Sequence, residues 1–307
     1  MMHWSLVLIF SIMGCEIIFC ITLNLLFTVI ILKSKTLRKS FTNIIFALMF
    51  VAHFLTNVCN IGKFCARFLT DTRYIDVISN SRDFFSGLVV GFSTLLSLVT
   101  FLSIYKPFVY EKFTTKHAVV AITTIFLIMI WFTVWRVYSL AAYFVAISIS
   151  NVAGVVIMIC NILLYRSVKR QCNDIASTIV TLDRQKQNQQ RNQTKKRSLK
   201  SLKMCILISA SYFITILSGI ILLLVRKIYF PDRYEEDFTA IVKNPDSIVF
   251  LYSTSAIIGV SNGIWDVFIF YKFNSEAKRK FRNVFGIFRG HNKVGVFSST
   301  FRKTLSL

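Results

Sequence analysis

The sequence contains few charged side chains, few acids and very few prolines. Only 16% of its 307 residues are charged and only 14 are acidic, whereas roughly a quarter of the residues in a typical soluble domain are charged. Hydrophobic residues make up 55% of the chain, and 30 of them are phenylalanines. A soluble core could not bury this much apolar surface, so the composition excludes a disordered chain and an ordinary cytosolic enzyme. It predicts an all-α protein that crosses a membrane several times.

Motifs for metal, redox or covalent chemistry are missing as well. The seven cysteines contain no C-x-x-C pair, and most of them lie inside apolar stretches, where a thiol packs as a small hydrophobe. The chain has no Ser-His-Asp arrangement, no H-E-x-x-H motif and no phosphate-binding loop. We therefore expect no catalytic residues, no metal site and no cofactor. No separate fold is available to bind nucleic acid.

Seven apolar stretches are long enough to cross a bilayer, which takes about 20 residues. A transmembrane bundle is expected over 1–271, and a cytoplasmic amphipathic helix and tail over 272–307. The predicted spans are about 5–33, 42–64, 77–104, 118–135, 139–165, 202–225 and 247–271. Beyond them, Phe281, Val284, Phe285 and Phe288 recur at near-helical spacing among basic residues, which predicts an eighth helix lying along the membrane.

Lys and Arg are distributed unevenly between the connecting segments. Four segments on one predicted side carry 27 of the 36 basic residues, and those on the other side carry eight. The positive-inside rule then places the N-terminus outside and the C-terminus inside a plasma membrane. Two interpretations of the basic side remain open. It can attract anionic lipids, or it can dock an acidic cytosolic partner.

Four short motifs resemble those of rhodopsin-like (class A) G-protein-coupled receptors. The third span closes with the stretch 102–110, LSIYKPFVY, which resembles R-Y-L-S-I-x-x-P-x-x-Y. Asn24 resembles the asparagine of the first helix, and the stretch 37–43 resembles the L-R-x-x-T-N that opens the second. Residues 273–281 resemble the F-x-N-x-x-F-R-x-x-F of the eighth helix. The motifs occur in the right order, and the resemblance implies a seven-helix receptor, of a divergent chemoreceptor type, that activates a heterotrimeric G protein.

Several family positions are occupied by other residues. The arginine of the D-R-Y triplet corresponds to Thr100, and the second-helix aspartate corresponds to His53. The N-P-x-x-Y stretch corresponds to 266–270, DVFIF, which lacks the proline. The family's activation mechanism therefore cannot be transferred whole to this chain.

Ionisable residues within membrane spans are costly and mark functional sites. Glu16 lies in the middle of the first span, where a protonated carboxyl and a hydrogen bond to a neighbouring helix are both compatible with the sequence. In the family register, His53 and Asp266 face each other in the bundle centre, and Asn24 and Asn262 belong to the same network. The family binds a sodium ion there. Two hypotheses remain: a protonated His53 replaces the cation and pairs with Asp266, or the two form a neutral hydrogen-bonded pair.

The same register suggests a ligand site near the outer ends of the helices. Arg82 occupies the place where amine receptors carry their ligand-binding aspartate, so an anionic ligand group is expected, with Asp83 as a partner of Arg82. A local salt bridge near the membrane surface is the alternative. The predicted lining is Arg82, Asp83, Ser86, Leu217, Ile220 and Tyr252. This largely apolar lining suits a small molecule, and a short peptide remains possible.

The predicted coupling face lies at the cytoplasmic ends of the helices. Phe108 follows Pro107 where the family presents a bulky apolar residue to the G protein, and basic residues surround it. The predicted coupling residues are Thr100, Lys106, Phe108, Lys200 and Lys203. The alternative for Phe108 is burial against neighbouring spans or insertion into lipid.

Three classes of function remain in competition. The first is a receptor that signals through a G protein. The second is a receptor-shaped protein that does not signal but heteromerises with, or traffics, other membrane proteins, and the loss of the D-R-Y arginine keeps it open. The third is a transporter, which the odd number of spans and the lack of an inverted repeat disfavour.

Overall fold

The computed structural model of the chain describes residues 4–66, 72–105, 110, 115–138, 200, 202–215, 217, 247–284 and 286, together with positions 152, 155, 158, 159, 161–163, 165 and 166. Within these ranges the protein is all-helical apart from short turns. The helices are α1 (Trp4–Lys33), α2 (Lys35–Arg38), α3 (Phe41–Ala66), α4 (Thr72–Tyr105), α6 (Thr115–Tyr138), α10 (Ser247–Phe273) and α11 (Ser275–Val284). A shorter apolar helix covers Leu202–Thr215.

Four of the described helices are long and apolar enough to cross a membrane. The candidate spans are Ser11–Lys33, Phe41–Lys63, Val77–Ser103 and Lys116–Trp135, and they coincide with the first four predicted spans. Large apolar side chains stay exposed on α1 and α6, among them Ile18, Leu25, Leu127 and Trp131, as lipid-facing surfaces require. The chain is therefore an all-α, multi-pass membrane protein.

The other three predicted spans are described to different extents. The helix α10 covers the last one, predicted at 247–271, and the Leu202–Thr215 helix covers the first part of 202–225. Most of 139–165 and all of 218–225 lie outside the described residues. The predicted eighth helix is observed as α11 from 275 to 284, while Phe285 and Phe288 lie outside the described ranges.

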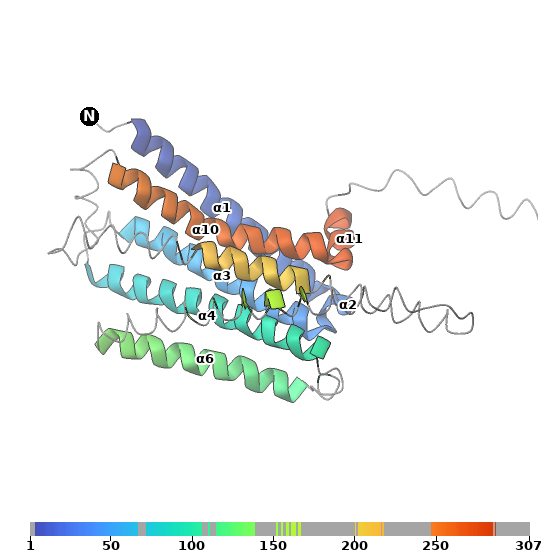
Figure 1. Ribbon diagram of the computed structural model, residues 1–307. Helices are drawn as coiled ribbons and strands as arrows, with labels where there is room; N and C mark the ends of the chain where they lie inside the picture. The colour runs from blue at the N-terminus through green and yellow to red at the C-terminus, as the bar shows by residue number, and fades with distance from the viewer. Residues whose placement is uncertain are drawn as a thin grey trace, which may run out of the picture.

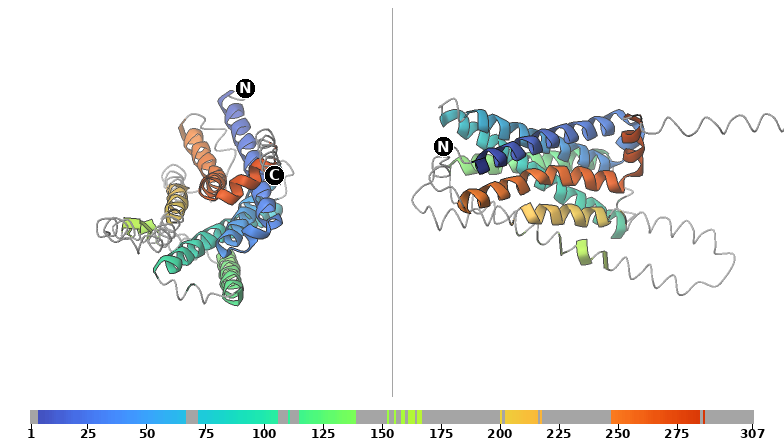
Figure 2. Two further views of the ribbon diagram at one scale, coloured as in Figure 1. Left: turned by 90° about the vertical axis from the view of Figure 1, so that its right-hand side faces the viewer. Right: turned by 90° about the horizontal axis from the view of Figure 1, so that it is seen from above.

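The long helices lie side by side, and α11 lies at the end of α10 where the chain turns away (Figure 1). Helix α3 packs between α1 and α4, while α10 packs against α1 and α3. Helix α6 contacts α4 and lies at the edge of the described group (Figure 2). Helices α1, α3 and α10 thus meet along one seam, and this seam positions the candidate site.

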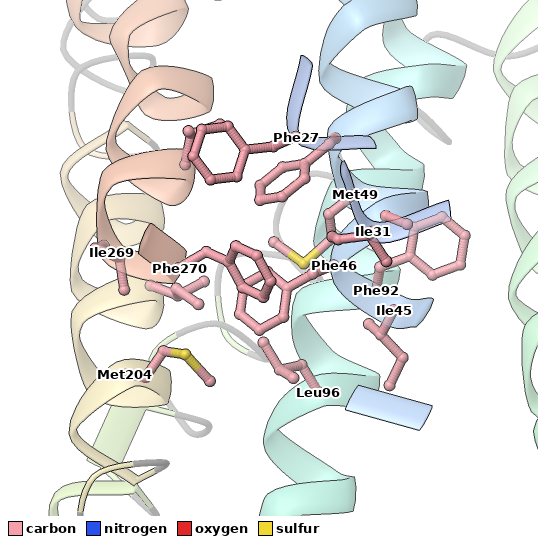
Figure 3. Packing of buried hydrophobic residues seen from close by; sticks show 14 of the residues in the cluster. Phe27, Ile31, Ile45, Phe46, Met49, Phe92, Leu96, Met204, Ile269 and Phe270 are labelled. Carbon is pink, nitrogen blue, oxygen red and sulfur yellow. The ribbon is translucent and has the colours of Figure 1, made fainter. Parts of the chain in front are cut away.

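Aromatic side chains fill the core at this seam (Figure 3). Phe46 and Phe270 lie with their ring centroids 4.6 Å apart, and Phe27 meets Phe50 and Phe270 edge to face. All four rings are fully or almost fully buried. Aromatic pairs of this kind contribute about 0.5–1.5 kcal/mol beyond the apolar area they bury. The cluster therefore joins α1, α3 and α10 into one packed unit.

Two glycines bring α4 close to α6, and alanine at these positions should have unequal effects. In Gly91→Ala the new Cβ would lie 2.6 Å from Cγ2 of Ile125, whose β-branched side chain has little rotamer freedom. We expect a loss of about 1–3 kcal/mol in the free energy of unfolding. In Gly87→Ala the new Cβ would meet Sδ of Met129, a flexible side chain that can move, so the loss should be smaller.

Thermal unfolding of the purified protein in detergent measures this difference. Gly14→Ala provides the control, because no atom lies within 4 Å of its added Cβ, and alanine favours a helix over glycine. Equal losses for Gly87→Ala and Gly91→Ala would contradict the packing argument.

Candidate functional site

A buried contact between His53 and Asp266 lies at the centre of the seam. Nε2 of His53, on α3, is 2.9 Å from Oδ2 of Asp266, on α10, although the two residues are 213 positions apart in the chain. The side chains are 8% and 2% exposed. The distance suits a hydrogen bond in either a charged or a neutral pair. It is the contact expected from the family register.

Amides from α1 and α3 form hydrogen bonds to the backbone of the helices that carry this pair. The Nδ2 group of Asn24 donates to the carbonyl oxygen of Cys20 at 2.8 Å and lies 3.4 Å from that of Gly263. The Nδ2 group of Asn57 donates to the carbonyl oxygen of His53 at 2.9 Å, and to Sγ of Cys20 at 3.3 Å. The network therefore links α1 and α3, which are neighbours in the sequence, to the distant helix α10.

The seam retains acceptor oxygens without a hydrogen-bond partner. Among the described residues, buried Oδ1 of Asn24, Oδ1 of Asp266 and Oε2 of Glu16 have none. Buried polar atoms without a partner are rare in proteins. Each of these oxygens can accept a hydrogen bond from a water molecule, and the two carboxyl oxygens can alternatively carry a proton. Within the described ranges no three His, Cys, Asp or Glu side chains are grouped to hold a metal ion.

A second set of hydrogen bonds ties the Leu202–Thr215 helix to the bundle. Oγ of Ser211 donates to Oδ1 of Asn262 at 2.5 Å. Nδ2 of Asn161 lies 3.2 Å from Oγ of both Ser97 and Ser209. Asn262 of α10 thus has its hydrogen-bond partner on the Leu202–Thr215 helix. Asn24 and His53 contact α10 at Gly263 and Asp266 instead. Hydrogen bonds between membrane helices typically contribute about 0.6 kcal/mol each to the stability of the folded bundle.

Sequence reasoning missed several members of these networks. The sequence does not single out Cys20, Asn57 and Asn161, because only the rotation of each helix decides what these side chains contact. A signal was nevertheless present. Cys20, Asn24, His53 and Asn57 lie four residues apart in pairs, so each pair shares one face of its helix.

Thr100, predicted at the coupling face, is buried inside the bundle. Its Oγ1 lies 3.1 Å from Sγ of Cys205 on the Leu202–Thr215 helix, and either atom can donate. Lys200 and Lys203 are exposed, and Nζ of Lys203 lies 5.8 Å from the ring centroid of Tyr165. The predicted coupling residues Lys106 and Phe108 lie outside the described residues.

The predicted ligand residues are brought together only in part. Arg82 and Asp83 form an ion pair, with Nη2 and Oδ1 2.8 Å apart and both side chains partly exposed. The side chains of Ser86 and Leu217 are exposed. Ile220 lies outside the described residues, as does the side chain of Tyr252, whose backbone belongs to α10. Of the six predicted ligand residues, Arg82 and Asp83 are in contact with each other in the part of the chain that the structure describes.

No protein-family model matches the chain, and no curated protein sequence matches it.

Proposed function

We propose that this protein is a divergent rhodopsin-like receptor with seven spans and an amphipathic eighth helix. It senses a small extracellular ligand and activates a heterotrimeric G protein at the cytoplasmic face of the plasma membrane. Its N-terminus lies outside and its C-terminus inside.

The observation that carries this proposal is the contact between His53 and Asp266. Four sequence motifs, read in the register of the family, led to the expectation that these two residues meet in the bundle centre with Asn24 nearby. They lie 2.9 Å apart, and Asn24 is buried beside the same helix. An unrelated bundle would bring together two positions separated by 213 residues only by chance, so the agreement supports the shared arrangement of helices.

The ligand class follows from the outer residues of α4. The Arg82 guanidinium favours a carboxylate or another planar anion, and Asp83, at 2.8 Å, holds it in place until a ligand competes. A small molecule or a short peptide with an acidic group fits this chemistry and the apolar residues predicted around it.

Thr100 distinguishes this chain from the rest of the family. A neutral contact with Cys205 stands where a salt bridge would otherwise hold the inactive state. A neutral hydrogen bond contributes about 1 kcal/mol, less than a charged one, so basal activity should be higher than is usual for the family.

Phe108→Ala tests coupling without the need for a known ligand. In cells that express the full chain and a G-protein dissociation sensor, the parent should give a basal signal. The variant should reduce it about tenfold or more at equal surface expression, since a central apolar anchor carries much of the energy of an interface. Phe113→Ala, an aromatic truncation in the same connecting segment, provides the control and should keep the signal.

A parent that gives no signal, either alone or with a library of acidic ligands, would favour the non-signalling, heteromerising alternative. An unchanged signal in Phe108→Ala would remove this residue from the coupling face.

The topology has its own test. An epitope tag fused after Leu307 should stain only after the cells are permeabilised, whereas a tag before Met1 should stain on intact cells, because the basic segments remain on the cytoplasmic side. A C-terminal tag accessible on intact cells would overturn the proposed orientation.

A further inference from the structure

Basic side chains gather around the Lys33 end of α1. Residues 33–43 and 275–284 contain eight basic residues and one acid, Glu276, whose carboxylate pairs with Arg279 at 2.7 Å. Both segments lie at the same end of the helices (Figure 1). We call these eight residues the basic rim: Lys33, Lys35, Arg38, Lys39, Lys278, Arg279, Lys280 and Arg282.

The turn between α1 and α3 holds its part of the rim in place. Oγ of Ser34 accepts a hydrogen bond from the backbone N–H of Leu37 at 3.4 Å, which caps α2. The side chain of Leu37 is buried in the core, so Lys35 and Arg38 remain exposed on the opposite side of this short helix. The cations are therefore carried by an ordered turn.

Helix α11 is fixed at both ends. Oδ1 of Asn274 accepts from the N–H of Ala277 at 3.0 Å, and its Nδ2 donates to Oδ1 of Asn43 at 3.1 Å, which ties the start of α11 to the start of α3. Further along, the ring of Phe281 stacks on Phe27 of α1, with centroids 5.3 Å apart. The basic residues of α11 thus keep a constant position relative to α1.

The two parts of the rim lie at the same end of α1 (Figure 1). Phe27 precedes Lys33 by six residues, which is about 9 Å along a helix. On its outward face, this stretch of α1 carries an apolar strip of Leu25, Val29 and Leu32, whose side chains are 49%, 38% and 49% exposed. The strip lies on the face of α1 opposite Phe27 and ends at Lys33 and the basic turn that follows it, while α11 reaches the same end of α1 from the Phe27 side.

We propose that the basic rim is a binding site for a membrane lipid with a multiply phosphorylated headgroup, of the phosphoinositide class. The acyl chains lie along the Leu25, Val29 and Leu32 strip, and the phosphates are held by Lys and Arg from both segments. The proposal depends on α1 crossing the membrane and does not depend on signalling.

Three features favour this lipid over other anions. The exposed apolar strip beside the cations can bind the acyl chains of an amphiphile, whereas an acidic cytosolic protein would not contact this part of a membrane span. Two basic segments on separate elements suit a headgroup with several phosphates, because each segment can contact a different one. Arginine in both segments adds bidentate contacts to phosphate.

A competition experiment on the full chain tests the proposal. The protein is placed in nanodiscs of neutral lipid, and the binding of a fluorescent phosphatidylinositol bisphosphate is measured. Unlabelled phosphatidylinositol bisphosphate should compete at least about tenfold better than phosphatidylserine at equal total headgroup charge. Soluble inositol trisphosphate, which lacks acyl chains, should compete at least about tenfold more weakly than the lipid.

Charge-neutralising variants locate the site. We expect a loss of binding of about tenfold or more in each of two double variants, Lys35→Gln/Arg38→Gln and Lys278→Gln/Lys280→Gln. The reason is that every Lys or Arg near an anionic lipid surface strengthens binding severalfold. The double variant Lys116→Gln/Arg166→Gln removes one lysine and one arginine that are exposed outside the rim, and should leave binding unchanged.

Several outcomes would overturn the inference. Equal competition by phosphatidylserine would mean that the attraction is generic, and equal competition by inositol trisphosphate would mean that the ligand is soluble. A loss in only one of the two rim variants, or an equal loss in the control, would exclude a shared site. Should the variants fail to fold, the wild-type protein alone decides: its melting temperature must rise with phosphatidylinositol bisphosphate and not with phosphatidylserine.

Discussion

Removal of either partner of the His53–Asp266 pair alone is expected to lower the free energy of unfolding by about 3–5 kcal/mol if the pair is charged. His53→Leu leaves the Asp266 carboxylate buried with neither oxygen bonded, because Oδ1 already has no partner among the described residues. Asp266→Leu leaves the imidazole without its acceptor. The double variant His53→Leu/Asp266→Leu removes both polar groups and should lose much less than the sum of the two single losses.

Chemical or thermal unfolding of the four purified proteins in detergent completes this double-mutant cycle. A neutral pair elsewhere in the bundle serves as the control: Ser211→Ala and Asn262→Ala break a hydrogen bond of 2.5 Å that carries no formal charge, and each should cost about 1 kcal/mol. Additive losses at His53 and Asp266 would show that the two side chains do not stabilise one another.

The second large effect is expected at Gly263. An added Cβ there would lie 2.8 Å from Sγ of Cys20 and 3.1 Å from Cγ and Nδ1 of His53. All these atoms are buried at the meeting of three helices, so α10 would have to move away from α1 and α3. We expect Gly263→Ala to lower the free energy of unfolding by about 1–3 kcal/mol and to lengthen the contact between His53 and Asp266.

Gly259→Ala is a closely matched control, one turn away on the same helix. No atom lies within 4 Å of its added Cβ, so the substitution should stabilise α10 by up to about 1 kcal/mol through helix propensity. The two variants should therefore differ in sign as well as in size. A stabilised Gly263→Ala protein would refute the close approach of α10 to Cys20 and His53.

The sequence predicted the described spans well, because long apolar stretches leave little choice of structure in a bilayer. The second span, expected at 42–64, is observed as α3 from 41 to 66. The third span, expected at 77–104, is observed at Val77–Ser103 inside the longer helix α4, which begins at Thr72 because the helix continues through polar residues that hydropathy does not count. Hydropathy locates the part of a helix that lies in lipid and does not locate its ends.

Within the central site, only the pairing of His53 with Asp266 could be predicted from the sequence, and that prediction relied on the resemblance to the receptor family. His53 and Asp266 were foreseen to meet, whereas the roles of Cys20 and Asn57 were not, because these depend on how each helix is rotated about its axis. Gly263 is a point of close approach to Cys20 and His53, and nothing in its sequence neighbourhood indicates this role. Composition carries no information about such rotations, since they are set by packing between distant segments.

The contact of Asn24 with the backbone of Gly263 has a consequence for the way the protein is made. The two residues are 239 positions apart, and a ribosome adds about 5–20 residues per second. The first helix therefore resides in the membrane for roughly 10–50 seconds before the helix that completes its polar face has been synthesised. During that interval Cys20 can already meet Asn57 of α3, whereas Asn24 lacks its contact with the backbone of α10. Helix α1 therefore acquires α3 as a neighbour early in synthesis and α10 only late.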